Sequence, residues 1–329
     1  MTYRRILLIA DPSMQLTPAC HRAERLARIS GAELYVDLFD DSRAVRAIGA
    51  MSPKLADVLR VDLIKQRQLW LRSLADRLHN AGVLAHTSVV WGSRIQERIL
   101  ERVAEVKPDL VVKDVHLEPL LKRVLFTPLD WQLLRTCPLP LLMVRGGSRK
   151  VPRRVIAAVD TAHPVKDADQ INAHIVEVAR SLAGQCDARL HLLHTFEDLI
   201  PVVPGEVVTA EAFNDAYERL RGIHRRRFEK FGDEQDIPRA QRHFVYGPSA
   251  YALAEFATHS HTDVLVVGTS HRTGLDRFFL GSTAEEILSE LRCDVLAVPP
   301  QVRPAATKRP QPRRSRRARP QEAAPLSLG

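Results

Sequence analysis

The feature that most constrains the fold of this chain is an internal repeat. The segment RRILLIAD at 4–11 returns as RRVIAAVD at 153–160, and each copy has the pattern of a short buried strand that ends in an acidic residue. Two further patterns return at a similar spacing, VVWG at 89–92 as FVYG at 244–247 and DLVV at 109–112 as DVLVV at 263–267. The period, about 150 residues, exceeds the roughly 20–50 residues of solenoid repeats, so the chain is read as a duplicated domain.

Length and composition agree with two globular domains. The chain has 329 residues and 45% apolar residues, enough for a core in each half. Its apolar runs are too short to span a membrane, and its first residues resemble a strand rather than a signal peptide. The four cysteines are far apart and form no CxxC pair, which predicts reduced thiols and a cytoplasmic protein.

Both halves are predicted to alternate strands with helices, which favours an α/β fold with a parallel sheet. In the first half, strands are expected at 4–10, 33–39, 85–91, 109–113 and 139–144, and helices near 15–30, 54–80, 93–106 and 128–135. In the second half, strands are expected at 154–160, 188–195, 241–246, 263–267 and 294–298, and helices near 167–183, 211–230, 249–259 and 283–291. The expected domains are 1–148 and 149–302.

Residues 303–329 form a third segment, rich in Pro and Arg. It holds eight Arg or Lys and one Glu, a charge of +7, so only +2 of the net charge of +9 belongs to the rest of the chain. Such a composition predicts disorder. Three uses stay open: solubility, salt-sensitive contact with nucleic acid or ribosomes, and binding of an acidic partner or an anionic membrane surface.

The stretch 263–283, DVLVVGTSHRTGLDRFFLGST, has the order of a phosphate site. An apolar strand ends at Gly268, a loop follows, and Gly281, Ser282 and Thr283 lead into a predicted helix. Glycines let the backbone approach a ligand, and a helix N-terminus offers unpaired N–H groups to an anion. The alternative reading is a capped helix preceded by a tight turn, without a ligand.

This stretch resembles the nucleotide loop of the universal stress protein family, which has Gly, two residues, Gly, nine residues, Gly, then Ser or Thr. Gly268, Gly281 and Ser282 match that pattern, but His271 stands where the family has its second glycine. The phrases FTPLDWQLLRTCP at 126–138 and VVGTSHRTGLDRFFLGSTAEEILSELRCD at 266–294 resemble the tandem-domain members of the family. The resemblance covers residues 4–300 and leaves out the basic tail.

The resemblance implies two tandem domains, each an open five-stranded parallel sheet with helices on both faces, Rossmann-like and similar to the adenine nucleotide alpha hydrolases. It implies ATP, with Mg²⁺, at the carboxyl ends of the strands. Asp160 would contact the adenine or ribose, while Gly268, Gly281 and Ser282 would hold the phosphates. Thr283 would cap the helix, and His271 would donate to a phosphate.

The first half lacks the glycine loop, since no glycine lies between Gly92 and Gly146. We therefore expect no ATP there, and the half serves as a packing partner or as a carrier of a lipid-like ligand. By the same resemblance, strands 139–144 and 294–298 would pair within the chain as a pseudo-dimer, which would hide two sheet edges. A homodimer and an unidentified protein partner are further expectations.

The function expected from these observations is that of a regulatory binding protein in the stress response, not an enzyme. A slow ATPase is the rival, although Asp160 is the one apparent Mg²⁺ ligand and a general base is not evident. A metal site is not expected, since His191 and His194 should face opposite sides of a strand. Ser282 lacks the G-x-S-x-G context of a hydrolase nucleophile.

Overall fold

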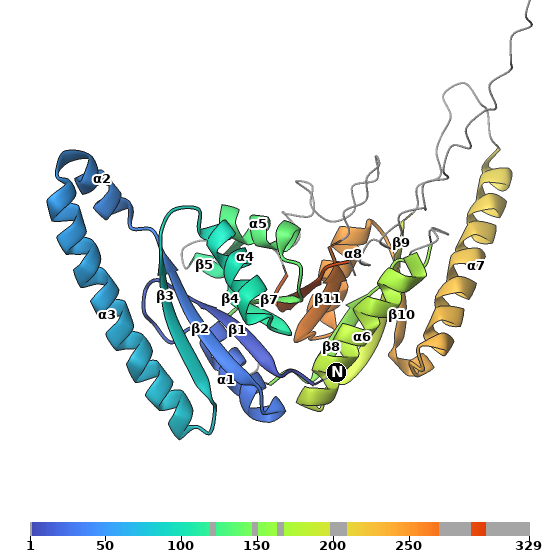
Figure 1. The fold of residues 1–329 in the computed structure, drawn as a ribbon. Coiled ribbons are helices and arrows are strands. Elements are labelled where there is room, and N and C mark those ends of the chain that lie inside the picture. The colour runs from blue at the N-terminus through green and yellow to red at the C-terminus, as the bar shows by residue number, and fades with distance from the viewer. Residues whose placement is uncertain are drawn as a thin grey trace, which may run out of the picture.

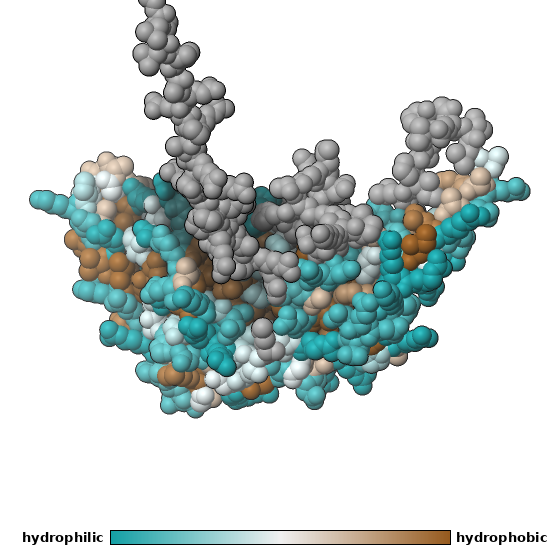
Figure 2. Space-filling model, turned by 45° about the vertical axis from the view of Figure 1, so that its right-hand side comes forward, coloured by the Kyte–Doolittle hydropathy of each residue, from teal (hydrophilic) through white to brown (hydrophobic). Residues whose placement is uncertain are grey.

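A single ten-stranded sheet runs through the computed structural model of this chain (Figure 1). The structure describes residues 2–118, 123–146, 151–162, 168–197, 209–269 and 291–300. The surface in Figure 2 is mostly hydrophilic, with separate hydrophobic patches. Residues 283–290 of the predicted helix 283–291 and the basic tail lie outside the described residues.

The first half alternates strands and helices as its sequence predicts. Its strands in the large sheet are β1 (Arg5–Ala10), β2 (Glu33–Asp40), β3 (Ala85–Trp91), β4 (Leu110–Asp114) and β7 (Leu141–Val144). A separate hairpin joins β5 (His116–Glu118) to β6 (Arg123–Leu125). The helices are α1 (Pro18–Ser30), α2 (Arg43–Met51), α3 (Pro53–Asn80), α4 (Ile95–Val106) and α5 (Pro128–Thr136).

The second half repeats this order. Its strands are β8 (Arg154–Ala158), β9 (Arg189–Phe196), β10 (Arg242–Tyr246), β11 (Val264–Gly268) and β12 (Asp294–Val298). Its described helices are α6 (Ala168–Cys186), α7 (Ala210–Glu234) and α8 (Ser249–His259), with one 3₁₀ turn, η1 (Arg239–Gln241).

The strand order shows why two similar halves make one sheet. The order is β10-β9-β8-β11-β12-β7-β4-β1-β2-β3, so each half contributes five neighbouring strands. Neighbours within each half are parallel, whereas β12 and β7 pair antiparallel where the halves meet. The expected α/β class with an open five-stranded parallel sheet in each half is confirmed. Strands β7 and β12 are also the two that were expected to pair.

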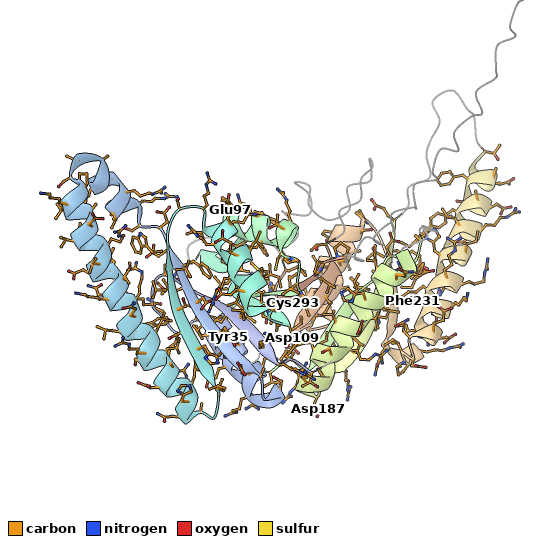
Figure 3. All side chains as sticks on the ribbon, in the orientation of Figure 1. Tyr35, Glu97, Asp109, Asp187, Phe231 and Cys293 are labelled. Atoms are coloured by element: carbon orange, nitrogen blue, oxygen red, sulfur yellow. The ribbon has the colours of Figure 1, made fainter. Side chains whose placement is uncertain are left out.

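Helices cover both faces of the sheet. One apolar core lies between the sheet and α1, α3, α6 and α7, and the other lies between the sheet and α4, α5 and α8. Figure 1 shows α3 and α7 at opposite ends of the sheet, and side chains fill the layers between helices and strands in Figure 3. Both faces of the central strands are therefore buried, which explains their nearly continuous apolar sequences.

The junction between the halves carries a buried ion pair. Arg22 of α1 lies 2.9 Å from Asp294 at the start of β12, and the two side chains are 2% and 0% exposed. The backbone N–H of Arg145 donates to the same carboxylate at 3.0 Å. Cys293, labelled near the centre of Figure 3, directly precedes this aspartate. Residues of both halves thus meet at one carboxylate.

Three details differ from the sequence-based expectation. Helix α2 was not predicted; it has only 9 residues and buries none of them. The hairpin β5–β6 was also not predicted. The strands predicted at 139–144 and 154–160 are shorter in the structure: Pro138 and Pro140 precede β7, and β8 ends at Ala158.

The two histidines of β9 face opposite sides of the sheet, as predicted from their spacing. The Nδ1 of His191 lies 3.0 Å from the Nε2 of His243, whose ring packs 4.7 Å from that of Phe256. His194 packs instead against Phe228, on the other face. Burial, aided by the nearby charge of Arg154, lowers the pKa of His191 to about 4 and also lowers that of His243. Both rings are therefore neutral at pH 7.

Substitution of Asp294 by Ala should destabilise the protein by about 3–5 kcal/mol, because it leaves the Arg22 guanidinium buried without its carboxylate. Asp57→Ala serves as the control, since Asp57 pairs with Arg60 on the surface and its loss should cost about 0–1 kcal/mol. Urea unfolding of both variants measures the difference. Equal losses would contradict a special role for the junction pair.

Stability should also decrease as the pH falls from about 6.5 to about 4. The pKa of His191 is lower in the folded state than its ordinary value of 6.5, so the neutral form is favoured by folding and protonation is favoured by unfolding. The expected loss is about 1–3 kcal/mol. Urea unfolding between pH 7.5 and pH 4 should show a shallower dependence for His191→Phe, whereas the exposed-histidine control His259→Gln should keep the wild-type slope.

Candidate functional site

Two of the six predicted site residues lie within the described part of the chain. Asp160 lies in the turn that follows β8, and Gly268 is the last residue of β11, the parallel neighbour of β8. Both therefore lie at the same carboxyl edge of the sheet, where open α/β sheets bind ligands. The other four, His271, Gly281, Ser282 and Thr283, lie outside the described residues.

The Asp160 turn is held by a buried amide. Asp160 Oδ1 accepts the N–H of Ala162 at 2.9 Å, which closes a local turn. The side chain of Asn172, on α6, accepts the backbone N–H of Asp160 at 3.1 Å and donates to its carbonyl at 2.6 Å. Asn172 is 3% exposed, so its amide is committed to this turn. One side chain thereby satisfies both backbone groups of the candidate residue.

Two further side chains reach the same turn. His194, 2% exposed, lies with Nδ1 3.0 Å from the Val159 carbonyl. The guanidinium of Arg227, on α7, donates to the Ala162 carbonyl at 2.7 Å. The turn is thus tied to β9, α6 and α7, and Asp160 is presented from a braced backbone.

Gly268 is a glycine for reasons of space. A Cβ at this position would lie 2.9 Å from the δ-methyl of Ile175 on α6, which would have to move. The backbone here is not left-handed, so the glycine is not needed for its φ angle. Close packing against α6 therefore favours a glycine here whether or not a ligand binds.

The first half places a carboxylate where the second half has Gly268. Asp114 ends β4 as Gly268 ends β11, and both strands pair in the same way with the first strand of their half. Asp114 is 7% exposed, accepts the Ala19 N–H at 2.8 Å and also binds the Thr17 hydroxyl. Burial raises the pKa of the Asp114 carboxyl, although the Thr17 and Ala19 hydrogen bonds and the Lys113 charge oppose this.

A second buried carboxylate lies beside it. Asp130 on α5 is 0% exposed and lies 2.7 Å from the ammonium of Lys113. It also accepts the backbone N–H of Thr127 at 2.7 Å, while the Thr127 hydroxyl accepts the N–H of Asp130, so the two form a capping box. The N-terminus of α5 is therefore satisfied from within the chain.

The ends of the two outer strands also differ between the halves. In the first half, Asp40 pairs with Arg67 of α3, whose guanidinium lies 5.6 Å above the ring of Trp91. In the second half the matching strand ends carry Phe196 and Tyr246, whose rings contact each other. The first half thus fills this position with an ion pair, and the second half fills it with aromatic rings.

Sequence reasoning missed Asn172, His194, Asp114 and Lys113. The internal repeat offered a signal for His194, because Leu38 occupies the matching position of the first half. A position that is apolar in one copy of the repeat and polar in the other indicates a specific polar contact in the second copy. Asp114 can be found in the same way, since it aligns with Gly268.

Neither a metal cluster nor a membrane helix is found in the part of the chain that the structure describes. No three His, Cys, Asp or Glu side chains converge there as metal ligands, and none of its helices is both long and apolar enough to cross a bilayer. An open groove of about 520 Å³ runs along α7 and is lined by residues of that helix with both charge signs. Neither Asp160 nor Gly268 lines this groove.

Comparisons with known proteins match both halves to one family. The model of the universal stress protein family matches residues 2–145 and again 153–299. Universal stress protein E of Salmonella typhi is 31% identical over 307 residues, which cover 91% of this chain and 95% of the relative. A universal stress protein E homolog of Haemophilus influenzae is 31% identical over 314 residues, covering 91% of this chain and 98% of the relative.

A solved structure agrees with these matches. A functionally unknown protein from Pseudomonas aeruginosa superposes with a TM-score of 0.69 at 25% identity, covering 91% of this chain and 93% of the other. The chain therefore belongs to the universal stress protein family, with one family domain in each half.

Proposed function

We propose that this chain is a regulatory stress-response protein that binds one ATP, with Mg²⁺, at the carboxyl edge of its second half. The observation that carries the proposal is the braced Asp160 turn beside Gly268, at an edge where the first half carries Asp114 instead. A preformed turn lowers the entropy cost of binding. The stress role rests on the names of the relatives, which match nearly the whole chain.

The proposed contacts divide between two strand ends. Asp160 accepts hydrogen bonds from the ribose or adenine, while Gly268, Gly281 and Ser282 offer backbone N–H groups and a hydroxyl to the phosphates. Thr283 caps the helix that follows, and His271 donates to a phosphate in place of the glycine of the family pattern. The Mg²⁺ neutralises phosphate charge when ATP is bound.

The chemistry of the first half disfavours the lipid-like ligand as a second function. Its carboxyl edge is occupied by the buried pairs Lys113–Asp130 and Asp40–Arg67, and an acyl chain would have to displace or cover these charges. We therefore assign the first half the role of a structural partner. Binding, rather than hydrolysis, is the proposed task of the second half, and the four free buried cysteines fit a reducing cytoplasm.

Calorimetric titration of ATP–Mg²⁺ into the full chain should give one site per chain. Asn172→Ala should weaken this binding about fivefold to tenfold, because the Asp160 turn loses two hydrogen bonds and must be ordered on binding. Val176→Ala is the matched control, since Val176 is fully buried on the same helix but carries no polar group toward the turn.

The outcomes separate the parts of this proposal. Two sites per chain would contradict the assignment of ATP to the second half alone. One site with equal affinity in wild type and Asn172→Ala would contradict the role of the turn. Lack of binding by the wild-type chain would overturn the proposed function.

A further inference from the structure

The N-terminus of α1 is occupied by a carboxylate from a strand far away in the sequence. Asp114 Oδ1 accepts the Ala19 N–H at 2.8 Å, and Oδ2 binds the hydroxyl of Thr17, the N-cap residue of α1. A helix N-terminus combines unpaired N–H groups with partial positive charge, so a buried anion there is stabilised. In many proteins a bound phosphate occupies such a position.

The same edge carries a second filled helix N-terminus. Asp130 caps α5, and the Lys113 ammonium contacts both the Asp130 carboxylate at 2.7 Å and the Asp114 carbonyl at 3.0 Å. Lys113 and Asp114 are 8% and 7% exposed, and Asp130 is 0% exposed. The N-termini of α1 and α5 are thus satisfied by two buried carboxylates of the chain itself, and one buried ammonium contacts the second of these carboxylates.

We propose that Asp114 is a built-in anion that holds the first half permanently in the state that a bound anion would otherwise stabilise. Gly268, at the matching strand end, has no side chain and cannot supply a carboxylate. The two halves therefore share a fold but differ in the group at this position. The N-termini of α1 and α5 in the first half are therefore satisfied by carboxylates of the chain itself. This inference does not depend on which ligand the second half binds.

Asp114→Gly should convert the α1 N-terminus into a site for a free anion. The variant should be less stable than wild type, since Thr17 and Ala19 lose their partner. Inorganic phosphate should then restore stability, raising the melting temperature of the variant about 3–5 °C more than that of wild type. Sodium chloride at matched ionic strength is the reference, and ³¹P line broadening reports the binding directly.

Two controls make the test specific. Asp109→Gly removes a carboxylate that accepts the Arg4 and Arg5 N–H groups at 2.7 and 2.9 Å, at the opposite end of β4, where no helix begins (Figure 3). It should be destabilised without a gain in phosphate response. Asp114→Asn keeps the shape of the side chain and fills the position, so its phosphate response should also equal that of wild type.

A phosphate response of Asp114→Gly no larger than that of wild type, or matched by Asp109→Gly, would overturn the inference. If the glycine variant does not fold, Asp114→Ser is measured in the same way, because its shorter side chain also vacates the position. Phosphate sites in the second half raise all variants alike and cancel in the comparison with wild type.

Discussion

The antiparallel pairing of β7 with β12 is the contact on which the architecture depends. Each half is an open parallel sheet, and the inner edge of each would expose unpaired N–H and C=O groups if it were alone. Pairing these edges makes one ten-stranded sheet, so the two halves cannot separate without breaking a strand ladder. The buried Arg22–Asp294 pair adds specificity to that ladder, because a wrong register would leave two charges without partners.

The shared fold leaves each half free to fill its carboxyl edge differently. The first half fills that edge with paired charges, Asp40 with Arg67 and Lys113 with Asp130. The second half has aromatic rings at the outer strand ends and a turn braced by Asn172 at the inner one. A buried charge pair is costly to break because removal of one partner leaves the other charge buried, and the turn in the second half is held by hydrogen bonds instead. The two halves thus share a fold but differ in the side chains at their carboxyl edges.

The strands and most helices were predictable because their signals are local. Buried strands such as β4 and β11 are short β-branched runs, and α3 repeats its leucines at helical spacing. Helix α2 was not predicted, and with 9 residues it is one of the shortest described helices. The surroundings of the candidate site were less predictable than its position. Asp160 follows a strand and can be named from sequence, but the Asn172 amide that holds it lies on the next helix, and only the fold brings the two together.

Gly268 is both the first glycine of the loop motif and a point of close packing between β11 and α6. In sequence it opens a phosphate-like loop, and in the structure a Cβ at this position would require the δ-methyl of Ile175 to move. The same position in the first half holds Asp114, which is accommodated because it turns toward Thr17 and Ala19. The matching strand ends of the two halves therefore carry different groups, a glycine in the second half and a buried carboxylate in the first. That carboxylate is bound to the N-terminus of α1, so the same strand position serves packing in one half and helix capping in the other.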